Sequence, residues 1–343
     1  MTFLPTTRRW FFGAAAAAAT IFGLSAAPAA YANDKVVLGA LRFTSHGAGF
    51  LAFEKGYFAD EGIDLSFQFF QAAQPIAVAT ASGDVDFGVA GVTGGLQNLA
   101  EKNALRIVAG VLHEKKGYDG MMVMASNKAY EAGLDAVPKI KGHSMAITQI
   151  GSTFHYMTSR IAEKEGFEVK DVKFVPLQKV GAMIAALKSG QTDAMIMVPH
   201  IAKSVVNAGD ARNIGWLNDY VEYQISTLFT NVKNIEDNRD MVERFIRAYA
   251  KGINEFNRVM LDPKADPAEV EAVTRIVHKY VYNDRPYEKA APSIQAGAMY
   301  LNTDAALNKT DVAKQMKWFQ DEGLVKSKLS VDQLVDDSFV KTY

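Results

Sequence analysis

The stretch Val36-Val37-Leu38-Gly39-Ala40-Leu41 decides the fold class, because a short apolar run rich in β-branched residues is typical of a buried strand. The polar loop Thr44-Ser45-His46-Gly47 follows it, and apolar residues at helical spacing follow that loop. A second strand is expected over 65–70. A helix of small residues is expected over 74–81, ending at Ser82-Gly83, a pair typical of a helix C-cap. This alternation predicts right-handed βαβ units in a mostly parallel sheet.

The same alternation continues and then restarts after about residue 127. Further strands are expected over 85–90, 105–112, 144–150, 172–176 and 193–198, and further helices over 96–101, 154–165 and 180–187. The segment 81–87 resembles the segment 188–194, because in each a helix stops at a glycine and a strand starts after an aspartate. This internal repeat suggests two similar α/β lobes.

Helical patterns replace the alternation from Asn234 onward. A long amphipathic helix is expected over 237–260, with Pro263 and Pro267 after it, and further helices are expected over 268–280, 289–301 and 311–321. Two apolar strands, near 121–127 and 224–230, are expected to cross between the lobes. The predicted fold is α/β, with lobe 1 formed by 33–125 and 226–343 and lobe 2 formed by 126–225.

The composition of the 343-residue chain excludes several classes of protein. Cysteine is absent, which excludes thiol nucleophiles, cysteine-ligated metals, iron–sulfur clusters and a lipid anchor on cysteine. The formal net charge is −1 and the chain has no basic run, which argues against a nucleic-acid partner. No specific catalytic or phosphate-binding motif occurs, so we expect no enzymatic activity, no cofactor and no metal site.

The first 32 residues predict an export signal. Arg8-Arg9 precedes an uncharged apolar run over 11–24, and Ala30-Tyr31-Ala32 is a small-x-small cleavage site. An uncleaved membrane anchor is the alternative, but the run is shorter than the ~20 residues that span a bilayer, and Pro28 follows it. We therefore expect a twin-arginine signal peptide at 1–32 and a mature protein in the periplasm.

Candidate ligand-binding residues lie in the loops after the strands, since open α/β sheets bind ligands at the carboxyl ends of their strands. In the segment 149–156 a strand ends and Ser152-Thr153 begins a helix, whose free N–H groups and positive dipole end attract an anion. In the segment 91–95, too, a strand ends and a residue with a hydroxyl group stands at the start of a helix. Gln71 and Gln74 could hydrogen-bond a polar group of a ligand through their side-chain amides. A plain helix cap or polar loop without a ligand is the alternative at each position.

Three of the six histidines, His46, His155 and His200, fall in or beside strand-to-helix loops. None of the six occurs at metal-ligand spacing. From the residues alone, these three either face a ligand, act as a base in a periplasmic enzyme, or are packing residues. Aromatic residues near the same loops, Phe154 among them, either belong to the core or stack on a ligand.

The segment 50–64, FLAFEKGYFADEGID, resembles the A-x-E-K-G-Y-F-x-x-E-G-(L/I)-D signature of the NitT/TauT group of ABC-transporter substrate-binding proteins, also called the NMT1/THI5-like group. The resemblance continues through 82–88, 151–156 and 187–194 and covers about 35–230. It implies a type II periplasmic-binding fold, in which two crossing strands join two α/β lobes and the ligand binds in the cleft between them. It also implies permease and ATPase partners at the inner membrane.

The resemblance further implies which loops line the cleft. Together with His155 from the loop pattern, the expected ligand-binding residues are Thr44, Ser45, His46, Gln71, Gln74, Val92, Thr93, Ser152, Thr153, Phe154, His155, Pro199 and His200. Relatives bind taurine, alkyl sulfonates, nitrate, aromatic carboxylates or pyrimidine vitamin precursors. The family usually has a Gly/Ser-rich turn where this chain has Gln71-Ala72-Ala73-Gln74, and the branch that makes a thiamine pyrimidine needs a cysteine-rich iron-binding segment, which this chain lacks.

The expected function is binding of a small organic anion, either sulfonate- or taurine-like or an aromatic carboxylate, by lobe closure. The protein is expected to act as a monomeric solute-binding component of an ABC importer. A second hypothesis is that the ligand is a neutral heteroaromatic compound, such as a pyrimidine vitamin precursor. Two further hypotheses are a periplasmic enzyme with a histidine base and a ligand-sensing module of a signalling receptor.

Overall fold

The computed structural model describes residues 33–325 and 329–343, and Asn33–Tyr343 form one compact unit. The predicted signal peptide at 1–32 lies outside the described residues. Within the described ranges, no helix is long and apolar enough to cross a membrane. The described strands form two five-stranded sheets and one two-stranded sheet, so the predicted α/β class is confirmed.

The first sheet, with the helices around it, is here called lobe 1. Its strand order is β2-β1-β3-β12-β4. The strand β1 is parallel to β2 and β3, whereas β12 is antiparallel to β3 and β4. The strands are β1 (Asp34–Leu41), β2 (Ile63–Phe70), β3 (Phe87–Gly91), β4 (Leu105–Gly110) and β12 (Ser226–Asn231).

The second sheet, with the helices around it, is here called lobe 2. Its strand order is β10-β6-β9-β7-β8. The strand β7 is parallel to β8 and β9, whereas β6 is antiparallel to β9 and β10. The strands are β6 (Met122–Ser126), β7 (Ser144–Ile147), β8 (Lys173–Pro176), β9 (Ala194–Met197) and β10 (Ala211–Trp216). Both sheets are therefore mixed, because β12 and β6 each enter their sheet antiparallel to the strands beside them.

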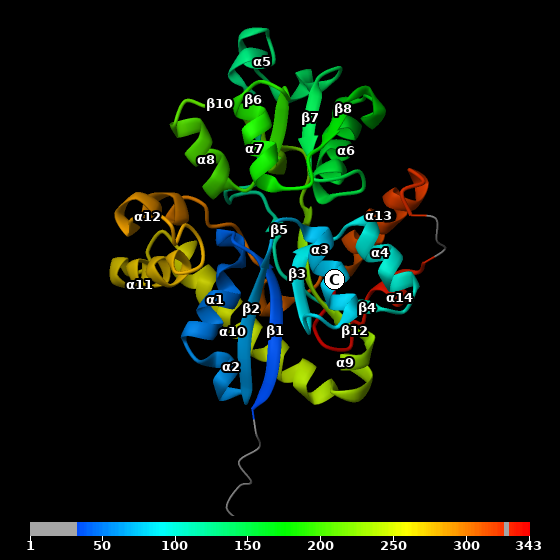
Figure 1. Cartoon of the computed structure of the whole chain (residues 1–343), viewed down its shortest axis with the longest axis vertical. Coiled ribbons are helices and arrows are strands. Elements are labelled where there is room, and N and C mark those ends of the chain that lie inside the picture. The colour runs from blue at the N-terminus through cyan, green and yellow to red at the C-terminus, as the bar shows by residue number, and fades with distance from the viewer. Residues whose placement is uncertain (1–32, 326–328) are drawn as a thin grey trace, which may run out of the picture. The chain divides into compact units, whose positions relative to one another are not determined.

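The helices follow the same division (Figure 1). Lobe 1 carries α1 (Gly47–Glu54), α2 (Tyr57–Asp60), α3 (Ala73–Ser82), α4 (Gly94–Glu101), α9 (Val232–Asp237), α10 (Arg239–Met260), α11 (Pro267–His278), α12 (Tyr287–Gln295), α13 (Lys309–Asp321) and α14 (Val331–Leu334). Lobe 2 carries α5 (Asn127–Glu131), α6 (Thr153–Glu165), α7 (Val180–Lys188) and α8 (Pro199–Asn207). Short 3-10 turns are η1 (Thr44–His46), η2 (Val137–Ile140), η3 (Val169–Asp171), η4 (Leu217–Asp219) and η5 (Thr303–Ala305).

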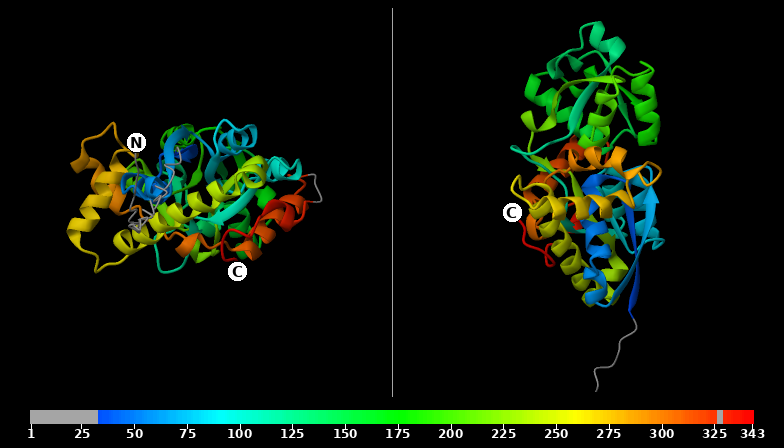
Figure 2. Two further views of the ribbon diagram at one scale, coloured as in Figure 1. Left: turned by 90° about the horizontal axis from the view of Figure 1, so that it is seen from below. Right: turned by 90° about the vertical axis from the view of Figure 1, so that its left-hand side faces the viewer.

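Two segments, 111–121 and 217–225, connect the lobes. They carry the short strands β5 (His113–Glu114) and β11 (Tyr223–Gln224), which pair antiparallel. The crossings were expected near 121–127 and 224–230, but most of those residues belong to β6 and β12 inside the sheets. The predicted positions of the crossings were therefore several residues too far along the chain. The right-hand view in Figure 2 shows the green elements of lobe 2 gathered apart from the blue, yellow and red elements of lobe 1.

One prediction in the C-terminal part is confirmed and another was inexact. The helix expected over 237–260 is α10 (Arg239–Met260), and Asn238, with a non-helical φ of −135°, separates it from the short helix α9 before it. The helix expected over 289–301 ends at Gln295. Pro292 lies inside that helix and interrupts its hydrogen bonds, and Gly297 follows its C-cap, so the apolar spacing up to residue 301 does not continue the helix.

The internal repeat corresponds to equivalent positions in the two lobes. Gly83 and Gly190, both with positive φ, end α3 and α7, and an aspartate three residues later precedes the next strand. The Asp86 carboxylate accepts a hydrogen bond of 2.8 Å from the backbone N–H of Val37. The Asp193 carboxylate accepts one of 2.8 Å from the backbone N–H of Ser144. Each aspartate thus ties the start of one strand to the start of its parallel neighbour, β3 to β1 and β9 to β7.

Candidate functional site

A cavity lies between the lobes, at the carboxyl ends of β1, β3, β7 and β9, where open α/β sheets bind ligands. The cavity has a volume of about 60 Å³. Lobe 1 and the connecting segments contribute Leu41, Phe43, Ser45, His46, Ala72, Ala73, Gly91, Leu112, Met121, Ile225 and Ser226 to its lining. Lobe 2 contributes Thr148, Thr153, Phe154, Met157, Val180 and Val198.

The two lobes touch directly beside the cavity. The backbone N–H of Gly94 donates a hydrogen bond of 3.0 Å to the carbonyl of Gly151. Gly91 lies so close to Thr153 that a Cβ added to the glycine would come within 2.3 Å of the threonine Oγ1. These contacts join the end of β3 to the start of α6, so the lobes are closed on the cavity in this structure.

The start of α6 presents unused hydrogen-bond donors to the cavity. Within the described residues, the backbone N–H groups of Thr153 and Phe154 have no hydrogen-bond partner. The Ser152 hydroxyl is buried, also lacks a partner, and does not cap the helix, because the N–H groups of His155 and Tyr156 bond the Ser152 carbonyl instead. Free N–H groups at a helix N-terminus and the positive end of its dipole stabilise an anion.

The start of α3 offers similar donors from lobe 1. The N-cap residue Ala72 has no side chain to cap the helix, and the N–H groups of Ala73 and Gln74 have no partner in the part of the chain that is described. Ser45, in the turn after β1, is 1% exposed, and its hydroxyl has no hydrogen-bond partner among the residues that the structure describes. The cavity is therefore bordered by unpaired donors from both lobes.

His46 is a neutral side chain in the cavity wall. Its Nδ1 accepts a hydrogen bond of 3.2 Å from the backbone N–H of Leu41, so the neutral ring carries its proton on Nε2. Burial lowers the pKa of His46 to about 3. The ring therefore holds the loop after β1 and has no basic nitrogen free to accept a proton at neutral pH.

His155 and His200 do not line the cavity. His155 Nδ1 accepts a hydrogen bond of 3.2 Å from the backbone N–H of Gly151, and burial lowers its pKa to about 4. His200, at the start of α8, is 1% exposed and packs edge-on against Phe43 and Tyr282, with ring centroids 5.5 and 5.8 Å apart. Neither nitrogen of its ring has a partner among residues 33–325 and 329–343, and burial, with a smaller effect of nearby His46, lowers its pKa to about 3.

The polar side chains expected around α3 and α4 bind each other. The Thr93 hydroxyl donates a hydrogen bond of 2.8 Å to Gln74 Oε1 and accepts one of 3.1 Å from the N–H of Leu96, which caps α4. Gln71 is exposed, and its carbonyl accepts a bond of 3.5 Å from the N–H of Val180 in lobe 2. Of the residues expected from the sequence, Ser45, His46, Thr153 and Phe154 line the cavity, whereas Thr44, Gln71, Gln74, Val92, Thr93, Ser152, His155, Pro199 and His200 do not.

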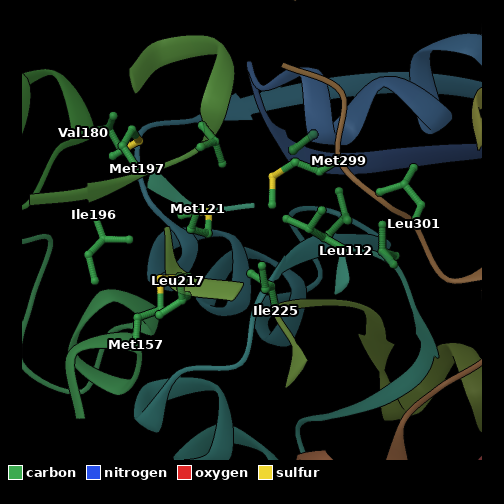
Figure 3. Packing of buried hydrophobic residues seen from close by; sticks show 14 of the residues in the cluster. Leu112, Met121, Met157, Val180, Ile196, Met197, Leu217, Ile225, Met299 and Leu301 are labelled. Atoms are coloured by element: carbon green, nitrogen blue, oxygen red, sulfur yellow. The ribbon is translucent and has the colours of Figure 1, made fainter. Parts of the chain in front are cut away.

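Sequence reasoning missed one whole wall of the cavity. Leu112, Met121 and Ile225 come from the two connecting segments and line the cavity together, and we call them the hinge wall. Figure 3 labels all three among the buried hydrophobic side chains, together with Met157 from α6. The apolar residues at 121 and 225 were recognised only as expected crossing strands, and that expectation was the one signal that could have pointed to this wall.

The cavity lining carries no formal charge. Among the described residues that line it, none is aspartate, glutamate, lysine or arginine, and His46 is neutral. Nor does the described part of the chain contain a group of three or more histidine, aspartate or glutamate side chains placed to hold a metal ion. The site can therefore bind a solute through N–H groups, hydroxyls and apolar surface.

Comparison with known proteins relates this geometry to a family. The sequence model of the family described as NMT1/THI5 like matches residues 43–263, and no curated protein matches the chain in sequence. The alkanesulfonate-binding protein SsuA from Xanthomonas axonopodis pv. citri, bound to MOPS, has a TM-score of 0.70 and 15% identity over 89% of this chain and 98% of SsuA. The periplasmic nitrate-binding protein NrtA from Synechocystis PCC 6803 has a TM-score of 0.69 and 13% identity over 90% of this chain and 87% of NrtA.

An enzyme has a related structure as well. The desulfurization enzyme DSZB has a TM-score of 0.59 and 14% identity over 90% of this chain and 97% of DSZB. At these identities the structural similarities establish the fold alone, and the expected periplasmic-binding-protein fold is confirmed. The family model spans well over half of the chain, so the chain belongs to the NMT1/THI5-like family.

Proposed function

We propose that this protein is the solute-binding component of an ABC importer and that it holds a small organic anion in the cavity between its lobes. One observation carries the proposal: Ala73 at the start of α3 and Thr153 and Phe154 at the start of α6 line this cavity, and their backbone N–H groups have no partner in the described residues. Helix N-termini neutralise an anion without a counter-charge, and lobe closure removes the anion from water. Relatives of this fold include proteins named for alkanesulfonate and nitrate binding.

The rest of the biological setting follows from the same proposal. The segment 1–32 would direct export through the twin-arginine pathway to the periplasm, where the protein would act as a monomer and deliver its ligand to a permease and ATPase. The expected lobe boundaries, 33–125 with 226–343 and 126–225, are kept within this proposal except at the first crossing, where β6 (Met122–Ser126) belongs to the sheet of lobe 2. The ligand would be released unchanged.

Two observations support binding rather than catalysis. The proton of neutral His46 is on Nε2, since Nδ1 accepts the N–H of Leu41, and a ring in this state is a poor general base. His155 likewise uses Nδ1 to hold Gly151 and stays out of the cavity. A binding protein of this kind raises its melting temperature with ligand and yields no product by NMR. Detection of a product would overturn the proposal.

A neutral heteroaromatic ligand is the second candidate, because the cavity lining carries no charged side chain. A thermal-shift screen separates the two candidates. We expect sulfonates or carboxylates to raise the melting temperature and pyrimidines to leave it unchanged. The reverse pattern would replace the anion with a neutral ring.

The variant Thr153→Ala tests the anion site itself. Loss of its hydroxyl from the cavity wall is expected to weaken binding of the best anion in the screen by roughly 1–3 kcal/mol, measured by calorimetry. The Ser152→Ala change removes a buried hydroxyl outside the lining, so added to Thr153→Ala it is expected to have little further effect.

The matched control is Thr158→Ala on the same helix. The Thr158 hydroxyl donates to the Phe154 carbonyl within α6 and does not line the cavity. This variant is expected to lose stability but keep its affinity. Equal affinity in Thr153→Ala and the parent protein would remove Thr153 from the site.

A further inference from the structure

The donors and the apolar surface of the cavity come from different parts of the molecule. The free N–H groups and the Ser45 hydroxyl belong to the loops at the strand ends. The hinge wall is formed by Leu112, Met121 and Ile225, and its one polar neighbour in the lining, Ser226, already accepts a hydrogen bond of 3.1 Å from the N–H of Leu112. A ligand with its acidic group at the donors would therefore place the rest of its body against apolar surface.

Among the described residues that line the cavity, none carries a carboxylate that could pair with a positive charge. Of the acids in the connecting segments, Glu114 is fully buried, and it does not line the cavity. Both of its carboxylate oxygens accept from the N–H of Met121, at 3.0 and 3.1 Å. Burial also raises the pKa of Glu114 to about 8, so this carboxyl is largely neutral at pH 7. A ligand ammonium group would be buried without a counter-charge, with only neutral hydroxyls among the lining side chains to accept its hydrogen bonds, which is unfavourable.

Resting on the proposed function, we infer that the ligand is a singly charged acid with an uncharged, apolar body and that the cavity rejects zwitterions of the same shape. The hinge wall is the specificity-determining surface. It favours a methyl or methylene group at the position where an amino acid or an aminosulfonate would place an ammonium group. Anions that carry an ammonium group are thereby excluded, and the unpaired N–H groups alone would not exclude them.

Matched pairs of acids that differ by one group test the inference. The pairs are butanoate and 3-aminopropanoate, propane-1-sulfonate and 2-aminoethanesulfonate, and 4-ethylbenzoate and 4-(aminomethyl)benzoate. In each pair a terminal methyl is replaced by an ammonium of similar size, while the acidic group stays the same. Calorimetry is expected to find a methyl member that binds, with its ammonium partner at least 100-fold weaker.

The outcomes distinguish this inference from the proposed function. An ammonium member that binds as tightly as its methyl partner, or more tightly, overturns the inference and leaves the anion site standing. Absence of binding by all six compounds also overturns it, and binding of another anion from the wider screen would then still support the proposed function. Failure of every anion in the screen overturns both.

Variants of the hinge wall give an independent readout. Ile225→Glu places an acid in the wall and is expected to improve the relative affinity of the ammonium member at least tenfold. Ile225→Gln, of similar size but uncharged, is expected to improve the relative affinity of the ammonium member less than Ile225→Glu does, because an amide oxygen accepts a hydrogen bond but supplies no counter-charge. Glu114→Gln is expected to leave the preference unchanged, because Glu114 does not face the cavity. If Ile225→Glu does not fold, the pairs on the parent protein still decide the question.

Discussion

Replacing Gly91 with alanine is expected to weaken ligand binding while both lobes stay folded. The φ angle of Gly91 is one that alanine adopts, so the backbone of β3 is not strained. The new Cβ would lie 2.3 Å from Thr153 Oγ1, 3.0 Å from Cγ2 and 3.2 Å from Cβ. Turning the threonine side chain away gives up its native rotamer, and with that rotamer kept the lobes must separate locally.

The magnitude follows from what this separation disturbs. Ordinary contact begins at 3.4 Å, so the gap between Gly91 and Thr153 must widen by about 1 Å. The adjacent hydrogen bond from Gly94 N–H to the Gly151 carbonyl, 3.0 Å long, is then weakened, at about 0.5–1.5 kcal/mol, and overpacking adds about 1–3 kcal/mol. Allowing for relaxation, we expect the closed state to lose about 1.5–3 kcal/mol and the affinity to fall roughly 10- to 100-fold.

The assay is calorimetric titration with the best anion of the screen, alongside thermal melting of the ligand-free protein. Affinity is expected to fall with little change in melting temperature. The double variant Gly91→Ala with Thr153→Ala removes the overlapping atoms Oγ1 and Cγ2, so it is expected to bind no more weakly than Thr153→Ala alone. Unchanged affinity in Gly91→Ala, or additive losses in the double variant, would refute this reasoning.

Three further predictions concern stability. Gly252→Ala in α10 would place a Cβ 2.4 Å from the backbone oxygen of a residue in α1, so despite the better helix propensity of alanine it is expected to lose about 1–3 kcal/mol of unfolding free energy in urea. Gly181→Ala in α7 meets nothing within 4 Å and is expected to gain up to about 1 kcal/mol, and equal effects of the two changes would contradict the packing argument. The folded-state pKa values of His46 and His200 are lowered to about 3, so unfolding takes up protons below the ordinary value of 6.5. The free energy of unfolding is expected to fall by about 1 kcal/mol per histidine for each pH unit from 6.5 downward. In His200→Asn, one proton fewer is taken up on unfolding, so the free energy of unfolding should depend less steeply on pH between pH 6 and 4.5. The pKa of Glu114 is raised to about 8, so the contribution of this carboxyl to stability falls as the pH rises from about 4.5 to 8. The melting temperature of Glu114→Gln relative to the parent should therefore rise over that range, and a constant difference would show that this carboxyl does not titrate as described.

The sheets were predictable because their strands are local, nearly continuous apolar runs. The run expected over 36–41 is β1 (Asp34–Leu41), and the one expected over 172–176 is β8 (Lys173–Pro176). The mixed direction of the sheets was not predictable, because the place of β12 between β3 and β4 depends on a pairing across more than one hundred residues. Short apolar periodicity contains no information on such a pairing.

The site was predictable where it depends on a single loop. Ser45 and Thr153 line the cavity because each lies just after a strand whose carboxyl end faces the other lobe. The Gln74 side-chain oxygen accepts a hydrogen bond from Thr93, which is 19 residues away, and the sequence did not indicate this pairing; a contact of Gln74 with the ligand stays a prediction. The hinge wall joins residues 112, 121 and 225, which only the folded connecting segments bring together.

The insertion of β12 between β3 and β4 has a consequence for synthesis. The described strands of lobe 2 all lie between Met122 and Trp216, so its sheet can be completed as soon as this stretch has emerged from the ribosome. Lobe 1, although it begins first, keeps open strand edges on β3 and β4 until Asn231 has been made. During translation the later lobe can therefore mature before the earlier one, and nascent chains halted before β12 would expose these edges and tend to aggregate.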